Sequence, residues 1–157
     1  MHSEGFYREI DGIVAQYPDP RSALLPILHR IQEEEGWISP EAQGWAAERL
    51  GLSPAMVSGV VSFYTMYRQA PCGRHLIQLC RTLSCELRGS LEIKARIRER
   101  LGIGPGETSA DGRFTLVEVE CLGACGTAPA MMIGDDYYEN LSPERVDEIL
   151  RDLAKAP

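Results

Sequence analysis

Four of the five cysteines of this chain fall in two short segments. Four residues separate Cys80 from Cys85 in "LCRTLSC", and three residues separate Cys121 from Cys125 in "ECLGAC". Cysteines paired in this way can form disulfides, bind zinc, act as a redox couple or hold an iron–sulfur cluster. The function predicted for the chain depends on which of these four chemistries applies.

The spacing separates the four possibilities. A thioredoxin-type redox couple uses Cys-x-x-Cys, which neither pair has, and zinc sites prefer two intervening residues although three or four occur. The polar, acidic N-terminus is unlike a secretory signal, which predicts a cytoplasmic protein in which structural disulfides are rare. A 2Fe-2S cluster takes two thiolates on each iron, one cysteine pair per iron. The spacing favours this cluster and leaves a structural zinc site and redox or inert thiols as alternatives.

The residues around the cysteines are suited to binding a cluster. Gly123 and Gly126 let the backbone approach inorganic sulfide closely and direct N–H groups at it. Cys85 is predicted to lie near a helix N-terminus, where the helix dipole favours a thiolate. Histidine ligands are not expected, because His2, His29 and His75 all lie outside the two cysteine segments.

The fifth cysteine lies outside the two cysteine segments, and the composition of the chain excludes several classes of protein. Cys72, between a proline and a glycine, is predicted to be a spare thiol in a linker. The 157 residues are 44% hydrophobic and 25% charged, which is typical of a folded protein with one or two small domains. The net charge of −7 and the absence of a basic run argue against nucleic-acid binding and against adsorption to a membrane surface. No apolar run is long enough to predict a membrane-spanning helix.

The first seventy residues predict short helices. Leu24, Ile27, Leu28 and Ile31 form a helical stripe that Gly36 ends. Ser39-Pro40 and Ser53-Pro54 each place a capping serine before a proline suited to the first helical turn. Residues 1–70 are therefore predicted to form a helical bundle.

The pattern changes in residues 71–157, which predict a separate α+β or α/β domain. The segments 75–80 and 113–120 alternate like strands, and a helix can follow Cys85. The residues Gly134-Asp135-Asp136 signal a hairpin, and Ser142-Pro143 opens a last helix. If neighbouring strands end on the same side of the sheet, both cysteine segments lie at one edge of it.

Several motifs together resemble a known family. The segments "EEEGWIS", "SFYTMY", "LCRTLSC", "LGIGPGET" and "VECLGACGTAPAM" are similar, in order and spacing, to the small 2Fe-2S subunit of bacterial NADH:quinone oxidoreductase, the E subunit of respiratory complex I. The resemblance extends from about Tyr17 to Leu153 and strengthens the 2Fe-2S prediction that the spacing already favours over zinc. It implies an N-terminal helical bundle followed by a thioredoxin-like α/β domain. Such domains often have a cis proline before a strand near the site, and Pro129 is the candidate.

The resemblance also implies a function. The cluster ligands of the family fall on Cys80, Cys85, Cys121 and Cys125. The cluster is expected to exchange one electron with FMN in a partner flavin subunit that binds NADH, and further iron–sulfur subunits are expected beside it. This chain is expected to have no NADH or flavin site of its own. It is expected to be cytoplasmic, in the peripheral arm of a membrane-bound complex.

Two alternatives remain beside the complex I assignment. NAD-dependent formate dehydrogenases and NAD-linked hydrogenases use an equivalent small subunit, and neighbouring genes would distinguish these from complex I. A stand-alone thioredoxin-like 2Fe-2S ferredoxin would lack the helical first half. Isolation as a free small protein instead of within a large complex would favour that alternative.

Overall fold

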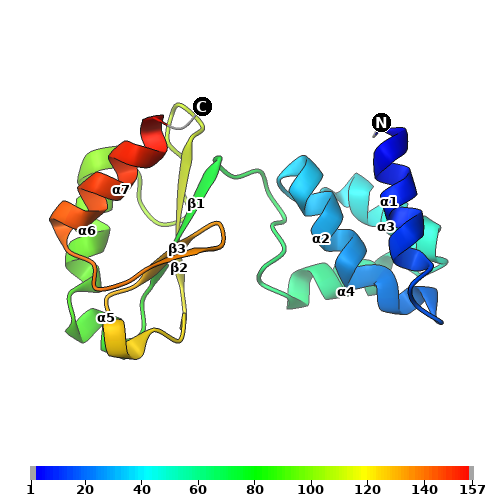
Figure 1. Cartoon of the computed structure of the whole chain (residues 1–157), viewed down its shortest axis with the longest axis horizontal. Coiled ribbons are helices and arrows are strands. Elements are labelled where there is room, and N and C mark those ends of the chain that lie inside the picture. Colours follow the sequence, from blue (N-terminus) through cyan, green and yellow to red (C-terminus); the bar gives the residue numbers. More distant parts are fainter. Residues whose placement is uncertain (1–2, 156–157) are drawn as a thin grey trace. The chain divides into compact units, whose positions relative to one another are not determined.

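The computed structural model describes residues 3–155 of the chain. The chain folds into two compact units. The first unit ends at Pro71 and the second begins at Cys72. The first unit is helical and the second contains the sheet (Figure 1). A helical N-terminal part followed by an α/β part is the mixed architecture that the sequence predicts.

The first unit contains four α-helices and one short 3-10 helix. In chain order these are α1 (Glu4–Val14), η1 (Pro20–Ala23), α2 (Leu24–Glu35), α3 (Pro40–Leu50) and α4 (Pro54–Phe63). The Ser39 and Ser53 side chains accept hydrogen bonds from the N–H groups of Ala42 and Met56, as their Ser-Pro signals predict. Gly36 ends α2 in a left-handed conformation that glycine adopts without strain.

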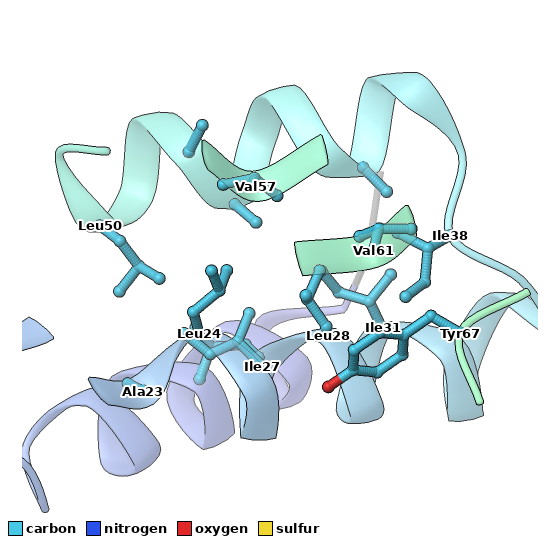
Figure 2. Close-up of a cluster of buried hydrophobic side chains, with 14 of the residues drawn as sticks. Ala23, Leu24, Ile27, Leu28, Ile31, Ile38, Leu50, Val57, Val61 and Tyr67 are labelled. Carbon is cyan, nitrogen blue, oxygen red and sulfur yellow. The ribbon is translucent and has the colours of Figure 1, made fainter. Parts of the chain in front are cut away.

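The helices of the first unit enclose their own hydrophobic core. The predicted stripe of α2 is buried, and Figure 2 shows Leu24, Ile27 and Leu28 directed from α2 toward the neighbouring helices. Tyr67, which follows α4, closes the core and donates a hydrogen bond of 3.0 Å to the Leu25 carbonyl oxygen. This unit therefore has a packed interior without help from the cysteines.

The second unit is a four-stranded sheet with helices. Its elements are β1 (His75–Cys80), α5 (Leu83–Leu87), α6 (Ser90–Leu101), β2 (Phe114–Val119), η2 (Cys125–Thr127), β3 (Met131–Ile133), β4 (Asp136–Tyr138) and α7 (Pro143–Lys155). The strand order is β2-β1-β3-β4. Strand β1 runs parallel to β2 and antiparallel to β3, and β3 pairs with β4 in the predicted hairpin.

Helices α6 and α7 lie side by side against the sheet (Figure 1). Ile93 and Ile97 of α6 pack with Leu116 of β2 in the core of this unit. An ion-pair network also joins the two helices, because Arg96 and Arg100 both donate to the Asp147 carboxylate, at 2.5–2.9 Å. The two helices therefore cover one face of the sheet together, and the ion pairs join them to each other.

Two details differ from or complete the sequence predictions. The helix predicted after Cys85 is two helices, because Gly89 has a φ of 102° that a right-handed helix cannot contain. The first of these helices, α5, begins before Cys85, which lies within its first turn. The Ala128–Pro129 peptide bond is cis, as predicted for Pro129.

A membrane span requires a helix that is both long and apolar. Within residues 3–155, no helix is long and apolar enough to cross a bilayer.

Candidate metal centre

The parallel pairing of β1 and β2 brings the two cysteine segments to one edge of the sheet. Cys80, the last residue of β1, is in register with Val119, the last residue of β2. Cys121 follows two residues after Val119, so both segments leave the sheet at the carboxyl ends of adjacent strands. Figure 1 shows α5 and the short yellow helix η2, which carry Cys85 and Cys125, at this same end of the sheet.

Cys80 and Cys85 form the buried half of the site. Both side chains are about 2% exposed and pack with Ala128 and Leu122, which lies in the other cysteine segment. The two thiols lie close enough for each to shift the pKa of the other. Contact between this pair and Leu122 shows that the two cysteine segments meet.

The Cys80 sulfur has several polar neighbours. Its thiol donates to the Glu120 carbonyl oxygen at 3.1 Å, and its sulfur lies 3.2 Å from the Thr82 hydroxyl oxygen. Burial opposes ionisation of Cys80, but the Thr82 hydroxyl and N–H, the Leu122 N–H and the Cys85 thiol together hold its pKa below the usual value. The surroundings of Cys80 therefore favour a thiolate, the form that binds metal.

Cys85 has fewer donors than Cys80. Burial is the largest cause that raises the pKa of Cys85, and the neighbouring Cys80 thiol raises it further. The Ala130 N–H lowers this pKa, and the charge of Cys125 raises it slightly. The influence of Cys125 places it within electrostatic range of the buried pair.

Cys121 and Cys125 form the exposed half of the site. The Cys121 sulfur accepts a hydrogen bond of 3.3 Å from the Gly123 N–H. Gly123 has a φ of 77°, a left-handed backbone conformation that glycine adopts without strain. The Tyr137 hydroxyl of β4 holds the same loop through a bond of 3.3 Å to the Leu122 carbonyl oxygen.

The arrangement of the four thiols indicates which kind of metal group they can bind. All five cysteines are free thiols. Within the described residues, no three or more His, Cys, Asp or Glu side chains gather closely enough to hold one metal ion. One tetrahedral zinc would need four ligands around one point, whereas a 2Fe-2S cluster spreads four thiolates over two irons. Two cysteine pairs at one sheet edge provide the two thiolates for each iron that a 2Fe-2S cluster takes.

His75, in the second unit, lies away from the two cysteine segments. His75 begins β1, at the opposite end of the strand from Cys80, where its ring lies 5.2 Å from that of Phe114. His29 lies in the first unit beside Tyr67, with ring centroids 5.1 Å apart. His2 lies outside the described residues.

The sequence singled out only some of the groups that donate to the sulfurs. N–H groups of the loop with Gly123 were expected to face the cluster, whereas Thr82 and the Leu122 N–H were not predicted as parts of the site. Thr82 stands two residues after Cys80, and that proximity was the only available signal.

A small sheet with two helices on one face and two cysteine pairs at one edge is the pattern of a thioredoxin-like iron–sulfur domain. Residues 10–154 match the model of the thioredoxin-like [2Fe-2S] ferredoxin family, and the chain belongs to this family. The family confirms the predicted fold class and the predicted type of cofactor, a 2Fe-2S cluster.

Curated relatives include subunits of NADH-quinone oxidoreductases. The E subunit of the Mycobacterium tuberculosis enzyme is 43% identical over 155 residues, which cover 95% of this chain and 62% of that protein. Subunit 2 of the Thermus thermophilus enzyme is 44% identical over 142 residues, which cover 88% of this chain and 78% of that protein. The chain thus spans 62% of the length of the mycobacterial relative.

The chain also has a fold likeness among solved structures. An NAD+-reducing [NiFe]-hydrogenase in its H2-reduced state superposes with a TM-score of 0.75 at 24% identity. The match covers 85% of this chain and 22% of the hydrogenase chain. At this identity the likeness shows the fold alone.

Proposed function

We propose that this chain is the small iron–sulfur subunit of an NADH-oxidising complex of the NADH:quinone oxidoreductase type. Cys80, Cys85, Cys121 and Cys125 would hold a 2Fe-2S cluster in the predicted domain of residues 71–157, which follows the predicted helical bundle of residues 1–70 in the sequence. The observation that carries the proposal is the parallel register of β1 and β2, which brings both cysteine pairs to one sheet edge. The names of relatives at 43–44% identity support the type of complex.

A cluster at this edge would supply a one-electron site beside a flavin, which receives two electrons as hydride from NADH. The partners in this proposal are a flavin- and NADH-binding subunit and further iron–sulfur subunits, in the peripheral cytoplasmic arm of a membrane-bound complex. The chain's own residues would hold the cluster, and the Thr82 hydroxyl and the Gly123 N–H lie within hydrogen-bonding distance of two of the proposed ligand sulfurs. Formate dehydrogenase and hydrogenase subunits are the weaker alternatives, because the hydrogenase likeness lies at only 24% identity.

Anaerobic reconstitution of the full chain with iron and sulfide tests the cluster. The wild-type chain should bind about two iron and two acid-labile sulfide per chain, with an electron paramagnetic resonance signal on reduction. Serine at any one of the four proposed ligands, for example Cys121→Ser, should weaken or abolish this signal. Cys72→Ser is the matched control and should leave it unchanged.

Two results would contradict the proposal. One is stoichiometric zinc without sulfide in the purified protein. The other is an unchanged signal in the ligand variants. The partner is tested separately, since NADH should reduce the reconstituted chain only when a flavin- and NADH-binding protein from the same genome is added.

A further inference from the structure

Thr82 occupies the N-cap position of α5 without capping that helix. Its backbone is extended, as at other N-caps, yet its side chain makes no hydrogen bond to the N–H groups of α5. The serines at the starts of α3 and α4, Ser39 and Ser53, both make the capping bond. The Thr82 hydroxyl lies instead 3.2 Å from the Cys80 sulfur. A residue type suited to capping is therefore used here for a contact with a proposed cluster ligand.

The direction of this hydrogen bond follows from the hydrogens available. A thiol carries one hydrogen, and that of Cys80 points to the Glu120 carbonyl oxygen at 3.1 Å. The sulfur is then left to accept from the Thr82 hydroxyl. When Cys80 binds iron it is a thiolate and carries no hydrogen, so the hydroxyl is again the only possible donor in this contact.

The surroundings strengthen the bond. Cys80 is about 2% exposed, so water competes little for its sulfur. A hydrogen bond in a buried, low-dielectric place is electrostatically stronger than one in water. Reduction adds negative charge to a cluster and its thiolates, and a donor to a ligand sulfur stabilises that charge. The bond therefore favours the reduced state.

We propose that Thr82 is a potential-tuning residue, whose hydroxyl donates to the Cys80 sulfur and raises the reduction potential of the cluster bound there. This inference rests on the proposed function. Thr82 holds no metal itself and acts through Cys80. Unlike the N–H groups that face the same sulfur, it can be removed by mutation.

The test is a redox titration of the reconstituted full chain, followed by the electron paramagnetic resonance signal of the reduced cluster. Thr82→Val keeps the shape and removes the hydroxyl, and should lower the ratio of reduced to oxidised cluster about threefold to tenfold at a fixed potential, tenfold being about 59 mV for one electron. Thr82→Ser keeps the hydroxyl and should stay near the wild type. Thr127→Val is the matched control, because the Thr127 hydroxyl lies in the other cysteine segment but bonds to Ala124 and Glu139.

Each outcome decides the inference. An unchanged potential in Thr82→Val, or equal shifts in the valine and serine variants, overturns it. If Thr82→Val does not retain the cluster, Thr82→Ala takes its place. If neither holds a cluster while Thr82→Ser does, the hydroxyl serves cluster retention and the tuning role is wrong. A wild-type chain that takes up no iron and sulfide would instead refute the proposed function.

Discussion

Replacing Gly73 with alanine should destabilise the start of the sheet in the second unit. A Cβ at Gly73 would lie 2.8 Å from the backbone C and N atoms of Phe114 and 3.0 Å from the C atom of Arg113. These atoms cannot move aside cheaply, because the adjoining His75 N–H is bonded to the Arg113 carbonyl oxygen at 2.7 Å. The clash therefore falls on the first pairing between β1 and β2.

The expected magnitude comes from two losses at the same place. Forcing a methyl group into a packed site typically costs about 1–3 kcal/mol. Moving the chain away also breaks the 2.6 Å bond from the Gly73 N–H to the Thr115 hydroxyl, which is 6% exposed, and an unmet buried group costs about 1–3 kcal/mol. The losses share one contact and overlap, so the variant should lose about 2–4 kcal/mol of unfolding free energy.

Native-state hydrogen exchange is the suitable assay, because it reports the free energy of opening at individual amides of β1. Tryptophan fluorescence would miss the effect, since both tryptophans, Trp37 and Trp45, lie in the first unit. Gly44→Ala is the matched control, because Gly44 lies within α3 and a Cβ there meets nothing within 4 Å. Alanine in a helix should be neutral or stabilise it by about 0.5–1 kcal/mol.

The reasoning fails if β1 amides in Gly73→Ala exchange with a free energy within about 0.5 kcal/mol of the wild type, the range typical of neutral surface changes. It also fails if Gly44→Ala is destabilised to a similar extent, because glycine replacement in general would then be the cause.

Three further outcomes are expected. Leu28→Ala, in the fully buried core of the first unit, should cost about 2–5 kcal/mol in urea unfolding followed by tryptophan fluorescence. Arg100 and Arg96 hold the pKa of Asp147 well below its usual range, so their stabilisation is present above about pH 4 and lost as the pH falls further. Asp147→Asn should remove that acid dependence of the melting temperature. Burial raises the pKa of Tyr67 to about 12, so its contribution to stability is complete below about pH 10 and declines toward pH 12. Tyr67→Phe should abolish the decline.

Local signals in the sequence predicted several helix boundaries correctly. The Ser-Pro pairs at Ser39 and Ser53 mark the starts of α3 and α4, because the serine oxygen and the proline ring act within one turn. The division between α5 and α6 was missed, because an isolated Gly89 is compatible with a helix until its φ is known. Whether Gly89 interrupts the helix depends on how the following helix, α6, packs.

The site was predictable only in part, for a similar reason. The spacing of Cys80 and Cys121 after two strands predicted a shared edge only if those strands were parallel neighbours, and strand order depends on the whole sheet. The bond from Thr82 could not be foreseen, because a threonine at an N-cap ordinarily bonds to its own helix. Only the position of the Cys80 sulfur draws the hydroxyl away from that role.

The buried and the exposed cysteine pairs differ in the groups that surround their sulfurs, and a hydrogen bond joins the two cysteine segments. The buried half already has donors facing the Cys80 sulfur, whereas the exposed half depends on a glycine-containing loop. A thiolate cannot donate, so binding iron must break the bond from the Cys80 thiol to the Glu120 carbonyl oxygen. Glu120 directly precedes Cys121. Loss of the thiol proton therefore removes a restraint on the segment that supplies the second pair of ligands, and it makes cluster binding depend on pH.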